Sequence, residues 1–417
     1  MIRRFQLLVI AAILLIAAFS TELPFLFYLV YLAILVIGGA YILTRLGLAD
    51  LEAGYAVNQL TGHVGERLQI TYTLRNTSRL PKPWLEIHNP TTLPGGLPGR
   101  ALSLGSRAER SWLVRAPLTR RGHFRVEPLQ IRTGDPFGFF EASAAVGQGV
   151  AVVVYPRIDR LPLWRLPAAS IEGSHSAPER TLQTSPLATA VRPYAPGDSF
   201  NRIHWRSTAR HGEIQVKEFE LEQTADAWIF LDLERAVQGG RGEESTVEVA
   251  CRAAASIADK ALLENRAVGM TVNAHRQAIV PADRGGRQHL KIMQLLAAVD
   301  GDGVTSLAES IVGSAGRLRR GMTAIIITPS QDRGWIRPIA ALRTRGIASV
   351  IVTLDAAAAD QVDREERRRR GETVADPTGP AEEQRAQKAR ALRHALAEYE
   401  LRVHAVSPGR SLAECLA

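Results

Sequence analysis

Two apolar runs open the chain, and a short polar break separates them. Residues 5–19 contain no charged side chain, and after the break at Glu22 a second uncharged run covers 24–43. An α-helix of about 20 apolar residues is long enough to cross the hydrocarbon core of a bilayer. The pattern therefore predicts a transmembrane helical hairpin within residues 1–46, with helices over about 5–20 and 24–43.

Positive charges flank the outer ends of this predicted hairpin. Arg3 and Arg4 precede the first apolar run and Arg45 follows the second, whereas the break carries only Glu22. Because Lys and Arg tend to stay on the cytoplasmic side, we expect a multi-pass protein of the cell membrane whose large folded region is cytoplasmic and whose first partner is the lipid bilayer. The alternative is a cleaved signal peptide before a single span, which would place the folded region outside the cell.

Residues 50–157 change to the two-residue period of short strands. Apolar and polar side chains alternate over 68–74, and turn signals follow at Asn76 and at Asp135-Pro136-Phe137-Gly138. Short strands at this spacing favour an antiparallel β-sandwich of the immunoglobulin-like kind. The predicted strands lie at 68–74, 84–87, 111–114, 121–126 and 150–155.

The rest of the chain first loses its periodicity and then alternates between strands and helices. Residues 158–190 are rich in Pro, Ser, Ala and Thr, so 158–222 is expected to hold a linker and then an arginine-rich segment. From 223 to 417, apolar strands such as 323–328 alternate with helical periods such as 246–263. This order predicts a C-terminal α/β domain with a parallel sheet that helices cover on both faces.

The composition is basic, with 51 Lys and Arg against 42 Asp and Glu and a net charge of +9. Such a charge suits an anionic partner such as nucleic acid or the inner lipid surface, although net charge alone specifies neither. A run of arginines between Arg364 and Arg370 lies in a stretch of about 356–400, which is expected to be a basic insertion in the α/β domain. It is either a lipid or nucleic-acid patch or a solvated helical segment with internal ion pairs. We expect the second, and therefore no nucleic-acid partner.

The segment that follows the linker concentrates arginine around a tryptophan. A helix here would place Arg202, Arg206 and Arg210 on one face, because positions four apart are neighbours on a helix. Asp198 is the predicted N-cap of this helix, and Gly212 is its predicted end.

Two interpretations of this segment remain open. Its guanidinium groups could form a docking surface for an acidic segment of a partner protein, through bidentate contacts to carboxylates. Alternatively, the arginines form a clamp between domains by pairing with carboxylates of the sandwich or the sheet, while Trp205 fills the junction.

The same segment carries a family resemblance. The block 192–220 resembles the signature of the domain of unknown function 58 family, and the Asp135-Pro136-Phe137-Gly138 turn is similar to a family feature. The resemblance implies two N-terminal spans, a C-terminal half of the von Willebrand factor A kind, and a protein partner of the MoxR type of AAA ATPase. The matching residues are Arg192, Tyr194, Pro196-Gly197-Asp198, Arg202-Ile203, Trp205, Ala209-Arg210 and Glu218, and Arg206 lies among them.

The resemblance also bears on metal binding. Many members of the family carry the adhesion-site motif D-x-S-x-S after the first strand of the α/β half. Here the same place reads Asp232-Leu233-Glu234-Arg235-Ala236, without either serine, and Thr305 matches the threonine of the site. Since Mg²⁺ needs nearly octahedral oxygen ligands, this degenerate site at Asp232, Glu234 and Thr305 is expected to hold no metal.

No motif in the sequence predicts catalysis. The P-loop, G-x-S-x-G and H-E-x-x-H patterns are absent, and two cysteines without a C-x-x-C pattern exclude a cysteine zinc site. We therefore expect a non-enzymatic, membrane-anchored scaffold or adaptor with no catalytic residues and no cofactor. The alternative is an enzyme, or a protein that binds an anion or nucleotide in a crevice near Asp232 and the loop Gly239-Gly240-Arg241-Gly242.

Overall fold

The computed structural model describes residues 2–21, 23–167, 190–195, 198, 200–218, 226–374 and 380–417. The chain divides into two compact units. The first comprises Met1–Arg157 with Met293–Ala298, and the second comprises Ile158–Ile292 with Val299–Ala417.

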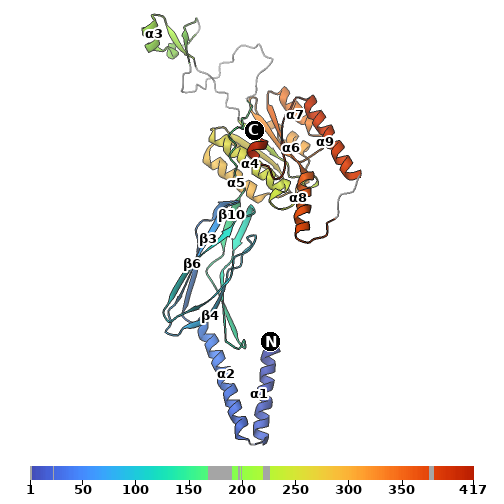
Figure 1. Cartoon of the computed structure of the whole chain (residues 1–417). Coiled ribbons are helices and arrows are strands. Elements are labelled where there is room, and N and C mark those ends of the chain that lie inside the picture. Colours follow the sequence, from blue (N-terminus) through green and yellow to red (C-terminus); the bar gives the residue numbers. More distant parts are fainter. Residues whose placement is uncertain are drawn as a thin grey trace. The chain divides into compact units, whose positions relative to one another are not determined.

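The first unit begins with two helices, α1 (Ile2–Thr21) and α2 (Pro24–Leu48) (Figure 1). Phe19 and Phe27 pack edge to face across the hairpin, with ring centroids 5.5 Å apart. Among the described residues, α2 is the one helix both long and apolar enough to cross a membrane. The sequence thus correctly predicts an apolar N-terminal helix.

Helix α2 extends five residues beyond its predicted end at 43, because the protein satisfies its last carbonyl groups. The Nζ of buried Lys82 donates to the carbonyl oxygens of Leu46 at 2.5 Å and Ala49 at 2.8 Å. Carbonyls at a helix end have no partner within the helix and need one from elsewhere. Burial lowers the pKa of Lys82 below its ordinary value.

The region after α2 is rich in β-strands, as the alternating pattern predicts. The strands form three sheets, with the orders β1-β3-β6, β2-β10-β7 and β5-β4-β8-β9. A common hydrophobic core includes Leu68, Leu85 and Val152, which come from the three different sheets. The strands are β1 (Leu51–Val57), β2 (Thr61–His63), β3 (Arg67–Asn76), β4 (Lys82–His88), β5 (Arg100–Leu104), β6 (Glu109–Pro117), β7 (Gly122–Val126), β8 (Leu129–Gly134), β9 (Glu141–Val146) and β10 (Val150–Tyr155).

The second unit is built on a six-stranded sheet in the order β15-β14-β13-β16-β17-β18. The sheet is mixed, so the prediction of a parallel sheet needs a correction at one edge: β15 pairs antiparallel with β14, and the other strands are parallel. Residues 274–276 between these two strands are too few for a crossover, so they can only join antiparallel neighbours. The strands are β13 (Ala227–Leu231), β14 (Val268–Asn273), β15 (Gln277–Asp283), β16 (Thr323–Thr328), β17 (Ala348–Leu354) and β18 (Arg402–Val406).

Helices lie between most of these strands in the chain, and α10 follows β18 (Figure 1). The stretch of about 356–400 was expected to form a basic insertion. It contains α8 and α9, which lie between the parallel strands β17 and β18 in the chain. Leu392 and Leu396 of α9 are buried in the core, while Arg367 and Arg370 of the arginine run pair with Glu372 and Glu366 at 2.7 and 3.4 Å. The helices are α4 (Thr246–Leu263), α5 (Gly285–Ala298), α6 (Leu307–Ser314), α7 (Ile336–Thr344), α8 (Ala356–Arg369), α9 (Pro380–Glu398) and α10 (Leu412–Cys415).

The start of the expected linker is part of the second unit. Leu161, Trp164 and Leu166 are buried, and the ring of Trp164 lies 4.9 Å from that of His404 on β18. The Thr323 hydroxyl donates to the carbonyl oxygen of Pro167 at 2.8 Å. Residues 158–167 are therefore packed chain, and the rest of the expected linker up to 189 lies outside the described residues.

Candidate functional sites

The arginine-rich segment forms a small folded element that we call the signature module, residues 190–218. Strand β11 (Ala190–Pro193) pairs antiparallel with β12 (Gln215–Glu218). Between them lie the short 3-10 helix η1 (Phe200–Arg202) and helix α3 (Trp205–His211) (Figure 1). Helix α3 ends at Gly212 in the left-handed conformation, with φ of 74°, which confirms the predicted end.

The predicted N-cap of this helix is wrong. Helix α3 begins seven residues after Asp198, and its N-cap is His204, whose Nδ1 accepts from the Ser207 backbone N–H at 3.1 Å. Asp198 instead forms a bidentate pair with Arg192, with both N–O distances at 2.8 Å. It also accepts from the Ala195 N–H at 2.9 Å, so it fixes the turn that follows β11.

The arginines do not all share one helix face, because Arg202 lies in η1 before α3 begins. Arg206 and Arg210 are one turn apart on α3, and both are exposed. Among the described residues, neither of these two has an ion-pair partner. Gly197 lies outside the described residues, and Glu218 is the last residue of β12.

Two aromatic side chains of the module face solvent. Trp205 is 70% exposed and Phe200 is 72% exposed, whereas soluble proteins normally bury such rings. Tyr194 is half-buried, and its ring lies 6.1 Å from that of Phe200. We call Phe200, Trp205, Arg206 and Arg210 the signature surface.

Asp232, the first residue of the degenerate adhesion motif, is fully buried at the carboxyl end of β13. Its Oδ1 accepts from Asn273 Nδ2 at 3.0 Å and from the Glu234 backbone N–H at 3.2 Å, and its Oδ2 accepts from Thr328 Oγ1 at 2.6 Å. Asn273 ends β14 and Thr328 ends β16. One carboxyl group therefore joins the ends of three neighbouring strands.

Electrostatics favour the neutral form of this carboxyl group. Burial raises the pKa of Asp232 above its ordinary value, and the hydrogen bonds from Thr328 and Asn273 oppose that shift. Burial also raises the pKa of Glu234, and the neighbouring acids Asp232, Asp332 and Glu309 add to the effect. A protonated Asp232 can donate from Oδ2 to the Thr328 hydroxyl.

Glu234 and Thr305, the other residues of the adhesion motif, contact this network through their backbones. Thr305 contributes its backbone carbonyl, which accepts from Asn273 Nδ2 at 2.9 Å. No group of three or more His, Cys, Asp or Glu side chains suited to a metal ion occurs in the described part of the chain. The arrangement serves to connect strands. Asn273 and Thr328 share one feature with Asp232 that is visible in the sequence: each is a polar residue at the carboxyl end of a buried apolar strand.

The glycine-rich loop after β13 has a packing role. The Gly239 N–H donates to Thr246 Oγ1 at 2.9 Å, and the Gly240 N–H donates to Asp360 Oδ1 at 2.8 Å. A Cβ atom at Gly239 would lie 2.5 Å from the carbonyl oxygen of Ala356. These glycines therefore allow the loop to approach α8, and their two N–H groups are already used within the protein.

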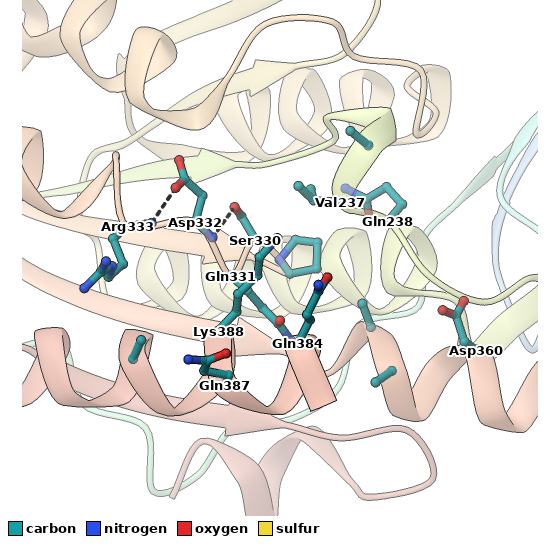
Figure 2. A pocket seen from close by; sticks show the side chains of 15 residues that line it. Val237, Gln238, Ser330, Gln331, Asp332, Arg333, Asp360, Gln384, Gln387 and Lys388 are labelled. Carbon is teal, nitrogen blue, oxygen red and sulfur yellow. Dashed lines mark hydrogen bonds between the residues drawn. The ribbon is translucent and has the colours of Figure 1, made fainter. Parts of the chain in front are cut away.

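A cavity of about 610 Å³ lies beside this loop, between the ends of β13 and β16 and helices α8 and α9 (Figure 2). Its wall is rich in amide groups, from Gln238, Gln331, Gln384 and Gln387, and it carries the cations Arg333 and Lys388. Figure 2 shows Gln384 and Gln387 facing the cavity from α9, opposite Ser330. The remaining lining residues are Ala236, Val237, Pro329, Asp332, Ala356, Ala357, Asp360 and Ala391.

Comparisons with known proteins place the signature module and the Asp232 network in one segment. Residues 190–376 match the family model described as "Protein of unknown function DUF58". The chain is also 26% identical over 284 residues to the uncharacterized protein YeaD of Bacillus subtilis (strain 168), and the aligned part spans 66% of each chain.

Solved structures add no argument, because their similarity is too low. The CARDB domain of a Pyrococcus furiosus protein has a TM-score of 0.19 at 14% identity, over 25% of this chain and 92% of that one. Proximal thread matrix protein 1 of the mussel byssus has a TM-score of 0.25 at 11% identity, over 31% and 37%. What the comparisons establish is that residues 190–376, which hold the signature module and the Asp232 network, match the DUF58 family of proteins of unknown function.

Proposed function

We propose that this protein is a membrane-anchored, non-enzymatic scaffold that binds a protein partner through the signature surface. Helices α1 and α2 form the anchor as a transmembrane hairpin, and the two folded units face the cytoplasm. Arg3 and Arg4 before the first apolar run and Arg45 after the second support this orientation, because Lys and Arg favour the cytoplasmic side. In this proposal the β-rich region is an immunoglobulin-like spacer, and the α/β region is of the von Willebrand factor A kind.

The observation that carries the proposal is the exposure of Trp205 and Phe200 beside Arg206 and Arg210, which form no ion pair with any residue that the structure describes. Tryptophan, tyrosine and arginine are the residues that dominate binding energy at protein interfaces. The Arg192–Asp198 pair and the β11–β12 pairing hold the module in shape without these side chains. This arrangement supports docking over the clamp, because the clamp needs a buried Trp205 and paired arginines.

The partner that the family resemblance suggests is a MoxR-type AAA ATPase. The chemistry of the surface fits a segment with carboxylates for Arg206 and Arg210 and an apolar patch for the rings. Both features belong in one partner surface, since charge sets the orientation of a complex and buried rings supply its affinity.

Replacing Trp205 and Arg206 together by serine should abolish capture of the ATPase by the full-length protein in detergent. The loss of one aromatic anchor and one charged contact should weaken binding at least about 30-fold, as two contacts of about 1 kcal/mol or more each are removed. The measurement is a titration of the purified ATPase from the same organism against the immobilised protein.

The control is His211→Ser, an exposed change on the same helix outside the signature surface. It should leave affinity unchanged, and the thermal midpoint of all three proteins should agree within a few degrees. Undiminished capture by the double variant would contradict docking through this surface, and a loss of folding would support the clamp instead.

A second candidate function is binding of a small polar or anionic molecule in the amide-lined cavity. The cavity supports it, since Gln331, Gln384 and Gln387 line it beside Arg333 and Lys388. The side chains of these three glutamines form no hydrogen bond in the described structure. Calorimetry with nucleotides and with Mg²⁺ tests it. Binding that Lys388→Ala abolishes would favour this function, whereas partner capture unaffected by Lys388→Ala favours the scaffold.

A further inference from the structure

The last turns of α2 are fixed to one end of the β-rich region. Tyr41 of α2 packs edge to face against Phe140, with ring centroids 5.5 Å apart. Gly47 lies directly against Thr133 of β8, since a Cβ atom added there would be 2.7 Å from Thr133 Cγ2. Lys82 of β4 holds the final carbonyls, as described above. Three contacts from separate strands and loops thus set both the position and the rotation of α2 against the β-rich region.

The loop between β8 and β9, residues 135–140, is held in a fixed shape at this end. Buried Asp135 accepts from the backbone N–H of Phe137 at 2.8 Å through Oδ1 and from that of Phe140 at 2.6 Å through Oδ2. Gly138 completes the turn with φ of 73°. The Asp135 carboxylate therefore holds the backbone of this loop. The aromatic side chains are not needed to form the turn, so their exposure calls for a separate explanation.

The loop presents aromatic rings to its surroundings. Phe137 and Phe139 stack with centroids 5.5 Å apart, and Phe137 is 58% exposed. Trp84 of β4 is 42% exposed, and its ring lies beside Gly134, the residue before the loop. We call Trp84, Phe137, Phe139 and Phe140 the aromatic rim.

The contact with α2 sets the height of the aromatic rim. Tyr41 lies two residues before the end of the uncharged run 24–43, and Arg45 is four residues further along the helix. At 1.5 Å per residue, Tyr41 and its contact Phe140 lie about 6 Å from the level of Arg45. In a spanning helix this is where hydrocarbon gives way to headgroups, the level at which aromatic side chains gather.

We propose that the aromatic rim inserts into the headgroup region of the bilayer beside α2, so that the β-rich region is seated on the membrane. This inference rests on the proposed membrane anchor. The occupant of the exposed rings is lipid, because the helix to which the loop is fixed passes through the bilayer at the same level. Water is a poor surrounding for stacked phenylalanine rings, whereas the interface solvates both the rings and the polar loop backbone.

The test attaches an environment-sensitive fluorophore, NBD, to single cysteines of the full-length protein in phosphatidylcholine vesicles. All variants carry Cys415→Ser, which removes the accessible thiol, and they keep the buried Cys251. The Cys415→Ser protein without an added cysteine measures background labelling. The labelled positions are Phe137→Cys at the rim, Leu35→Cys in the middle of α2, and Leu60→Cys as the control. Leu60 is exposed and follows β1, whose seven residues lead about 20 Å away from the end of α2.

The label at 137 should emit at shorter wavelength than the label at 60, and lipids with a quencher near the headgroup should quench it more than lipids with a quencher at the chain end. The label at 35 should show the opposite quencher preference. Emission from 137 that matches 60, with 35 still in lipid, would overturn the seated rim while the anchor stands. If 35 also reports water, the membrane anchor itself fails.

Discussion

Replacing Asp232 by alanine should lower the free energy of unfolding of the α/β unit by about 3 kcal/mol. The change leaves the Thr328 hydroxyl and the Glu234 N–H without their hydrogen-bond partner, and Asn273 Nδ2 keeps only the carbonyl of Thr305. Each buried polar group that loses its partner costs about 1–3 kcal/mol. The thermal midpoint should fall by roughly 6–12 °C for a region of this size.

Asp232→Asn should give a different result that depends on pH. The pKa of Asp232 is raised in the folded protein, so between about pH 4 and that raised value the unfolded chain is ionised while the folded one is still protonated. The free energy of unfolding of the wild type therefore falls as pH rises through this window. Asparagine keeps the acceptor Oδ1 and can donate to Thr328 Oγ1, so the free energy of unfolding of the variant should not show this decline. The variant should therefore become more stable relative to the wild type as pH rises.

The matched control is Asp332→Asn, an exposed acid near the same edge of the sheet. Its stability should follow that of the wild type at every pH. Denaturant titrations of the detergent-solubilised proteins between pH 4 and 8 provide the measurement. An alanine variant that loses less than about 1 kcal/mol, or parallel pH profiles for wild type and Asp232→Asn, would show that the three-strand connection is unimportant.

Gly303→Ala should destabilise the same unit by about 3 kcal/mol or more, the upper range for overpacking a core. A Cβ atom at this position would lie 2.1 Å from the carbonyl oxygen of Asn273 and 2.8 Å from that of Leu233. Both neighbours are backbone atoms, so no side-chain rotation relieves the clash. The main chain around Asn273 would have to move, which also disturbs its hydrogen bond to Asp232.

Gly313→Ala is the control for this change. Gly313 lies in α6, shortly after the same loop, and nothing lies within 4 Å of an added Cβ atom. Alanine is the better helix former, so this variant should be roughly 0.5–1 kcal/mol more stable. Equal stability of the two variants would mean that the loop around Gly303 adapts freely, against the close packing of Gly303 on the backbone of Asn273 and Leu233.

Most strands and helices were predictable because burial repeats with a fixed period. Strand β3 and helix α4 have the alternation and the helical spacing that their burial requires. Strand β15 was missed because it is a half-exposed edge strand that contains Pro281, so neither an apolar run nor a clean alternation marks it. Leu161 and Trp164 were assigned to a linker because composition cannot show that isolated apolar residues pack on a distant strand.

The candidate sites divide in a similar way. The signature residues and Asp232 could be identified from the sequence, since they match a motif or close a buried strand. The partners of Asp232 could not, because its connection to Asn273 and Thr328 depends on which strands become neighbours. The Arg192–Asp198 pair depends instead on the shape of the turn that follows β11. The cavity has no motif at all, since its glutamines come from loops and helices far apart in the chain.

The pairing of β11 with β12 has an evolutionary consequence. Ala190 and Glu218 are opposite one another in the ladder, so the chain enters and leaves the module at nearly the same point, about 5 Å apart. A module whose two ends lie so close together can be shortened, enlarged or exchanged while the core to which it is attached keeps its fold. Under the proposed function, the surface that binds a partner can therefore change while the α/β core stays the same.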